Sequence, residues 1–218
     1  MNKKYTDYAM NNFDNILYTP LDIPLLPLTN RTQIIDLYQA NATDIEKPTD
    51  PNLSVFWKGI TCYKGPTFTA DRLLHVGTFV DMADLLKEEI AIMNSYLPLE
   101  VETISLWTNV QDVPAHRDKK IYDTRLDFRF RFAIAQEKKS FFIEYDHKKR
   151  YIDLPNTTNL FCFNNQSCMH GGSFDESNFK ILGVIRGKIN DEQKLSNLLE
   201  KSMQKYKDVC YTQDNYFR

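Results

Sequence analysis

The sequence lacks several features that mark common classes of protein. It has only four cysteines in 218 residues, and none of them shows the C-x2-C spacing of a zinc site. This excludes a disulfide-dense secreted scaffold and predicts a reduced, intracellular protein. No apolar run approaches the roughly 18 residues of a membrane span, and the polar start Met-Asn-Lys-Lys-Tyr has no apolar signal core behind it. We therefore expect a soluble cytoplasmic protein.

An excess of charge of one sign is also lacking. The chain has 27 basic and 29 acidic residues and a formal net charge of −2. This balance predicts no polyanion-binding surface, so nucleic acid is not an expected partner. The hydrophobic content of 42% and the aromatic content of 13% indicate a folded globule. A chain of this length can bury a core around an internal site.

The N-terminal half contains few strong periodic patterns. Frequent prolines in residues 1–50 predict an irregular arm that packs on the core, with a short helix at residues 31–39. A strand is expected around residues 54–62. Apolar residues recur at helical spacing over residues 81–97, and Pro98 ends that predicted helix.

Short strands separated by polar turns dominate the rest of the chain. The predicted strands are residues 101–108, 126–135, 141–145, 151–154, 159–163 and 179–189. A terminal helix capped by Asn190 follows them. The pattern predicts a mainly β protein with flanking helices. We expect one domain, in which residues 1–98 form the arm and supporting helix, 99–190 the catalytic core, and 191–218 a C-terminal helix and tail.

Three residues could hold a metal ion. His116-Arg-Asp118 is followed fifty-two residues later by His170, which precedes two glycines. Residues i and i+2 of a strand point to the same side, so His116 and Asp118 could bind one metal together. Each motif alone is commonly a solvated turn or a hydrogen-bonded core histidine. Together, two imidazoles and one carboxylate suit a mononuclear iron(II) that keeps positions open.

The pattern of H-x-D, a distal His and a basic residue shortly after it resembles the iron(II)- and 2-oxoglutarate-dependent dioxygenases. The similarity covers about residues 99–189 and favours the prolyl 4-hydroxylase and aspartyl/asparaginyl hydroxylase-like branch. It implies a double-stranded β-helix core (a jelly roll, cupin-like) and Fe(II) held by His116, Asp118 and His170. It also implies 2-oxoglutarate and dioxygen as cosubstrates, and hydroxylation of an amino-acid or peptidyl side chain of the Asp, Asn or Pro type.

Two basic residues could anchor the far carboxylate of 2-oxoglutarate, which the resemblance assigns to the strand after the distal His. Lys180 lies ten residues beyond His170, as in the prolyl 4-hydroxylases. Arg186 is the alternative, because an even step of six residues puts it on the same face of an unbroken strand. A lysine supplies a point charge and an arginine a bidentate fork. The spacing favours Lys180.

Two further arginines alternate with phenylalanines in the strand predicted at residues 126–135. Arg129 and Arg131 therefore share one face. Directed inward they would form an anion pocket; directed outward they would form a solvated face. The aspartyl/asparaginyl branch carries R-x-H here, and this chain lacks that His. We expect both arginines to serve cosubstrate or substrate, at least one meeting the prime substrate, with Trp107 and Asn109 as further pocket residues.

Two other classes of function stay open. A cupin-like metal protein of non-oxidative function could use the same three ligands, because zinc also accepts two histidines and a carboxylate. A non-catalytic binding or structural module could retain the fold without turnover. Conversion of labelled 2-oxoglutarate to succinate would separate these classes. The remaining histidines, His75 and His147, have no partners at a useful spacing.

Overall fold

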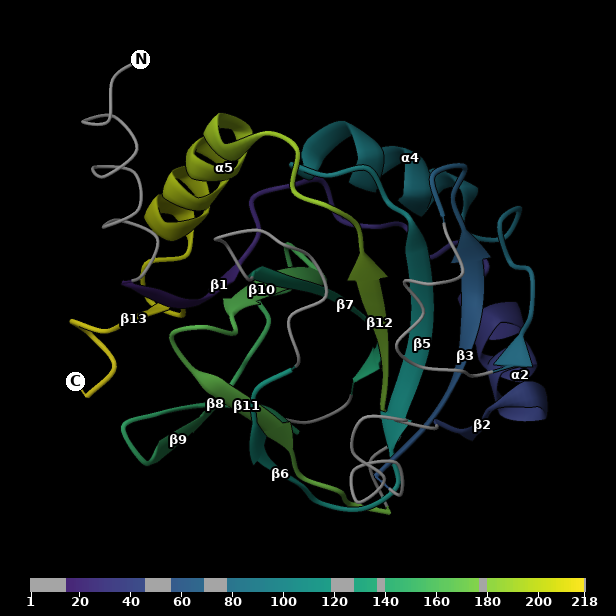
Figure 1. Ribbon diagram of the computed structural model, residues 1–218, viewed down its shortest axis with the longest axis horizontal. Helices are drawn as coiled ribbons and strands as arrows, with labels where there is room; N and C mark the ends of the chain where they lie inside the picture. The colour runs from purple at the N-terminus through teal and green to yellow at the C-terminus, as the bar shows by residue number, and fades with distance from the viewer. Residues whose placement is uncertain are drawn as a thin grey trace.

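Two β-sheets form the body of the molecule in the computed structural model, which describes residues 15–45, 56–68, 78–118, 128–136, 140–176 and 180–217 (Figure 1). The larger sheet has the order β13 (Tyr211–Thr212), β1 (Ile16–Pro20), β10 (Leu160–Asn164), β7 (Phe128–Gln136), β12 (Lys180–Arg186), β5 (Thr103–Asn109), β3 (Trp57–Lys64), β2 (Thr43–Asp44). Its pairs are antiparallel, except that β4 (Thr78–Phe79) runs parallel to β3. The smaller sheet is antiparallel, with the order β6 (Val113–His116), β11 (Met169–Gly172), β8 (Phe141–Tyr145), β9 (Lys148–Tyr151).

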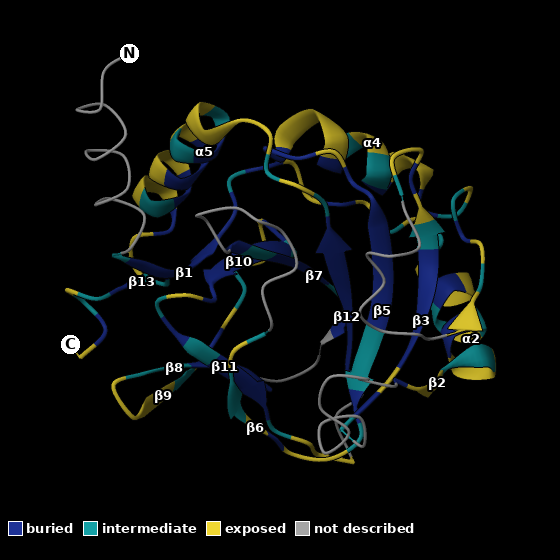
Figure 2. Cartoon of the chain, in the orientation of Figure 1, coloured by how far each residue is buried: buried dark blue, intermediate teal, exposed yellow. Residues whose placement is uncertain are grey.

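Three helices lie at the edge of this β body within the described residues. They are α2 (Arg31–Asn41), α4 (Lys87–Tyr96) and α5 (Glu192–Lys205). In Figure 1, α4 and α5 lie along the top of the view and α2 lies beside β2 and β3. Figure 2 shows buried central strands and helices whose outer faces are exposed. The prediction of a mainly β protein with flanking helices is confirmed.

The eight strands from β5 to β12 pair in a nested order. β5 pairs with β12, β6 with β11, β7 with β10, and β8 with β9. The chain therefore runs out from β5 to β8 and returns beside itself from β9 to β12. This arrangement brings β6 and β11, which carry the two histidines of the predicted metal site, directly together.

Most predicted elements are present, with shifts that have local causes. The strand expected at residues 151–154 begins earlier and covers Lys148–Tyr151 (β9). The reason is a tight turn immediately after β8, where Asp146 and His147 adopt φ values of 48° and 62°. The helix expected from residue 81 begins only at Lys87. The Asp81 carboxylate accepts a hydrogen bond from the Ala83 backbone N–H at 3.0 Å, and this stabilises a turn ahead of the helix.

The two ends of the described chain also differ from the prediction. Residues 16–20 form β1 and are not irregular, since β1 lies between β10 and β13 in the larger sheet. Its Pro20 stands at the end of the strand, where a missing N–H is tolerated. Asp191, and not Asn190, caps α5 through a 2.8 Å hydrogen bond from the Lys194 N–H.

The four cysteines are free and buried, in agreement with their prediction as small apolar side chains. Among the described residues, no helix has the length and apolar character needed to cross a membrane.

Gly183 in β12 provides a test of the packing between β12 and the neighbouring strand β7, where it pairs with Phe132. A Cβ at this position would overlap the ring of Phe132, which is fully buried. We expect Gly183→Ala to lower the free energy of unfolding by about 1–3 kcal/mol, measured by urea denaturation. Gly172→Ala is the control, because its Cβ would meet nothing closer than 3.4 Å. Equal stability of the two variants would contradict this packing.

Candidate metal centre and its pocket

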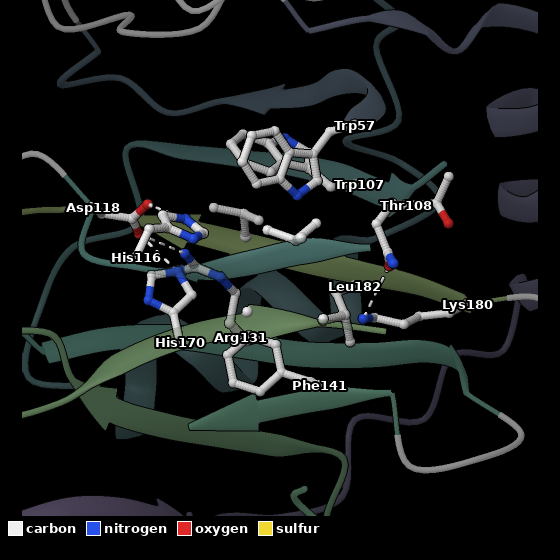
Figure 3. A pocket seen from close by; sticks show the side chains of 15 residues that line it. Trp57, Trp107, Thr108, His116, Asp118, Arg131, Phe141, His170, Lys180 and Leu182 are labelled. Atoms are coloured by element: carbon white, nitrogen blue, oxygen red, sulfur yellow. Dashed lines mark hydrogen bonds and ion pairs between the residues drawn. The ribbon is translucent and has the colours of Figure 1, made fainter. Parts of the chain in front are cut away.

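The three predicted metal ligands converge at the junction of β6 and β11. His116 is the last residue of β6 and pairs directly with His170 of β11, while Asp118 lies two residues beyond the strand. One ligand atom from each residue lies within 4.8 Å of the others. His116 Nε2 is 3.8 Å from Asp118 Oδ1, and His170 Nε2 is 3.6 Å from Oδ2. Figure 3 shows the three side chains pointing toward one another.

The orientation of His116 and the protonation of His170 suit metal binding. His116 Nδ1 donates to the Pro114 carbonyl at 2.9 Å, which leaves the lone pair on Nε2, the nitrogen that faces Asp118. Burial holds the pKa of His170 well below its ordinary value, although Asp118 opposes this shift. His170 can therefore offer a neutral nitrogen near pH 7, and His116 presents its Nε2 atom to the same carboxylate. The residues fit a divalent metal ion such as iron(II).

Asp118 lies within a cationic surrounding. Arg129 Nε and Arg131 Nη2 each stand 3.4 Å from its Oδ2 atom. Burial alone would raise the pKa of Asp118, but the positive field of its neighbours holds that pKa well below the usual range. The neighbours that lower it are His170, Arg131, Arg129 and His116, and of these the two guanidinium groups carry a permanent positive charge. Asp118 is thus held as a carboxylate, the form in which it can act as a metal ligand.

The two arginines point into the molecule, with side-chain exposures of 11% for Arg129 and 8% for Arg131. The sequence predicted that Arg129 and Arg131 share one face of their strand and that an anionic group meets them. The structure places both of them against the carboxylate of Asp118, where a group of the prime substrate was expected. Contact with a substrate stays a prediction.

A pocket runs along the inner face of the larger sheet beside the three ligands. Its cavity volume is about 60 Å³. Figure 3 shows the ligands at one end of the pocket and Lys180 at the other. The lining residues are Trp57, Trp107, Thr108, Asn109, Val113, His116, Asp118, Arg131, Phe141, His170, Gly171, Gly172, Lys180, Leu182 and Val184.

The two candidate anchor residues differ in their position relative to this pocket. Lys180 lines it, and its Nζ donates to Asn109 Oδ1 at 3.2 Å. Arg186 is buried at the far end of β12 and does not line it; its guanidinium lies 5.5 Å from the centre of the Trp107 ring. Trp107 and Asn109 are both pocket residues, as predicted.

Lys180 is a buried cation. It is 6% exposed, and no carboxylate among the described residues forms an ion pair with it. Burial lowers the pKa of its ammonium to about 8. A buried ammonium without an anionic partner favours the binding of an anion, since the anion would compensate the cost of removing the charge from water.

Sequence reasoning missed two residues of this centre. Trp57 packs edge-on against His116 with ring centroids 5.6 Å apart, and Asn165 contacts the backbone of Asp118. Both come from segments distant in sequence, so no local spacing indicated them. Of the other histidines, His147 is exposed in the turn between β8 and β9, and His75 lies outside the described residues.

Searches of protein-family models and of curated proteins find no match to this sequence. Among solved structures, the chain is similar to a prolyl-4-hydroxylase of Pseudomonas putida, with a TM-score of 0.46, 10% identity, and coverage of 84% of this chain and 98% of that one. It is similar to AviO1 of Streptomyces viridochromogenes Tue57 (TM-score 0.44, 12% identity, 85% and 96% coverage). It is also similar to an oxidoreductase of the 2OG-Fe(II) oxygenase family from Burkholderia pseudomallei (TM-score 0.42, 10% identity, 86% and 93% coverage). At these values the likenesses assign no family to this chain.

The buried charge of Lys180 predicts a pH-dependent stability. Its folded pKa of about 8 lies below an unfolded value of about 10.4. Between these values the unfolded chain binds more protons, so this group makes the protein more stable as the pH rises. Lys180→Met should therefore be more stable than the wild type by up to about 3 kcal/mol at pH 7, and the difference should vanish toward pH 10.5. Urea denaturation of both proteins across this range measures it, and a difference independent of pH would refute it.

Proposed function

We propose that this protein is an Fe(II)/2-oxoglutarate-dependent dioxygenase that hydroxylates an amino-acid or peptidyl side chain. The observation that carries the proposal is a single narrow pocket with two histidines and a carboxylate at one end and a buried, unneutralised lysine at the other. Such a pocket suits a small dicarboxylate that reaches from a metal to a cation.

The nested pairing of β5 to β12 supports a jelly-roll core, also described as a double-stranded β-helix. In that architecture, the outgoing and returning strands alternate between two facing sheets. Here β5, β7, β10 and β12 belong to the larger sheet, and β6, β8, β9 and β11 to the smaller one. We place the metal site between these two sheets, on β6 and β11.

In this proposal His116, Asp118 and His170 would hold Fe(II). Bound iron with 2-oxoglutarate and dioxygen supplies the oxidative decarboxylation that drives hydroxylation of the substrate. Arg129 and Arg131 keep Asp118 ionised and fix the direction of its Oδ2 atom. Neutral imidazoles and an ionised carboxylate are the forms that bind the metal.

Lys180 binds the far carboxylate of 2-oxoglutarate, and two neighbouring side chains support it. Asn109 accepts a hydrogen bond from the lysine and holds its ammonium toward the pocket. The Ser140 hydroxyl is buried and has no hydrogen-bond partner among the described residues; Ser140 and Lys180 line the same adjoining hollow. That hydroxyl offers a second donor to an incoming carboxylate.

The pocket walls are apolar between these two ends. Trp57, Trp107 and Phe141 lie along them with Leu182 and Val184 of β12. Apolar walls exclude water from the pocket, and ionic contacts there are stronger than in bulk solvent. Trp57 covers one side of His116.

The ligand assignment predicts the loss of turnover on removal of one ligand. His170→Ala should reduce conversion of labelled 2-oxoglutarate to succinate by at least about a hundredfold, because a three-ligand site that loses a histidine loses metal affinity and geometry. His147→Ala is the matched control, since His147 is exposed at a turn. Succinate production by His170→Ala at the wild-type rate would refute the assignment. Metal binding by the wild type without any succinate production would favour a non-oxidative metal protein.

The anchor assignment predicts a difference between two basic residues. Lys180→Ala should raise the Michaelis constant for 2-oxoglutarate by roughly a hundredfold or more, because a buried carboxylate would lose its charged partner at a cost of about 3 kcal/mol. Arg186→Ala should change this constant far less, since Arg186 does not line the pocket. Steady-state kinetics with varied 2-oxoglutarate measure both. The reverse ranking would move the anchor to Arg186.

A further inference from the structure

The position of Asp118 is not set by strand pairing. The pairing of β6 with β11 ends at the His116–His170 pair, and Asp118 lies two residues further along the chain. A residue beyond the end of a strand lacks the ladder of backbone hydrogen bonds that fixes its neighbours. The carboxylate nevertheless has to stand within bonding reach of the same metal as the two histidines.

Asn165 supplies the missing hydrogen bonds. The Asp118 N–H donates to Asn165 Oδ1 at 2.8 Å, and Asn165 Nδ2 donates to the Asp118 carbonyl at 2.9 Å. An asparagine side chain carries the same amide group as the backbone, so its two bonds reproduce a strand partner for a single residue. Asn165 is 2% exposed, and water therefore competes weakly for these bonds.

We propose that Asn165 is a positioning residue of the metal centre, which holds the backbone of Asp118 so that its carboxylate completes the ligand set. This inference rests on the proposed function. Asn165 acts on backbone atoms, whereas Arg129 and Arg131 act on the carboxylate. The two sets of contacts are therefore complementary: one places the residue, and the other directs its side chain.

The two hydrogen bonds between Asn165 and the backbone of Asp118, called the clamp below, come from a turn close to a second predicted ligand. Asn165 stands in the turn between β10 and β11, and the same turn leads into His170. Asn164 accepts hydrogen bonds from the backbone N–H groups of Gln166 and Ser167 and keeps this turn in shape. This turn thus holds Asp118 through the Asn165 amide and leads directly into β11, which carries His170.

The chain contains a matched control for this clamp. Asn159, which precedes β10, binds the backbone of Leu26 in the same manner: the Leu26 N–H donates to its Oδ1 at 3.1 Å, and its Nδ2 donates to the Leu26 carbonyl at 3.0 Å. Asn159 does not line the metal pocket. Removal of either amide costs two similar hydrogen bonds, but only Asn165 contacts a metal ligand.

The test compares metal binding by Asn165→Ala and Asn159→Ala with the wild type, and Asn165→Ser and Asn159→Ser form a second pair. Cobalt(II) is the probe, added to the metal-free protein and followed by calorimetry and by its visible absorption spectrum. We expect the Asn165 variants to bind cobalt(II) about 10–100-fold more weakly, as for other residues that orient metal ligands, with a changed spectrum. We expect the Asn159 variants to keep wild-type affinity and spectrum while losing similar thermal stability.

Wild-type affinity and spectrum in the Asn165 variants would overturn the inference. So would equal weakening in the Asn159 variants, because the effect would then come from general stability. If both Asn165 variants failed to fold while both Asn159 variants folded, Asn165 would be a determinant of folding and the inference would also fall. Absence of cobalt(II) binding by the wild type would instead refute the proposed function.

Discussion

The register between β6 and β11 is the constraint on which the candidate centre depends. It sets His116 directly opposite His170, and the two imidazole centroids stand 4.4 Å apart. Side chains of directly paired residues lie on the same face of a sheet, so both rings enter the same pocket. A shift of one residue would turn one histidine to the opposite face and separate the pair. Asp118, Lys180 and the apolar pocket walls line the same pocket as this pair.

Charged side chains are buried around this centre, although removing a charge from water is unfavourable. Asp118 is ionised inside the protein because two guanidinium groups face it, and Lys180 is buried without a carboxylate among the described residues. Buried ionic groups of this kind contribute little to stability by themselves. For Lys180 this burial is better explained by ligand binding, since an anion bound there would compensate its buried charge.

The sequence was sufficient for those features that depend on local spacing. The alternation of β7 predicted that Arg129 and Arg131 share a face, and H-x-D followed by a distal His predicted three residues that the structure brings together. The sequence was insufficient where contacts join distant segments. The clamp of Asn165 on Asp118 spans 47 residues and depends on a turn geometry that no periodicity reveals. The strand β1 was also missed, because prolines near it predicted irregular structure and its partner β10 is distant in sequence.

The central claim is that one pocket holds a metal at His116, Asp118 and His170 and a dicarboxylate that extends to Lys180. The most direct measurement is an anaerobic crystal structure with iron(II) and 2-oxoglutarate, using anomalous scattering to locate the metal. We predict one iron peak within bonding distance of the three side chains, with the far carboxylate of 2-oxoglutarate on Lys180 Nζ. An iron peak elsewhere, or a carboxylate bound to Arg186 with Lys180 left unpaired, would contradict the claim.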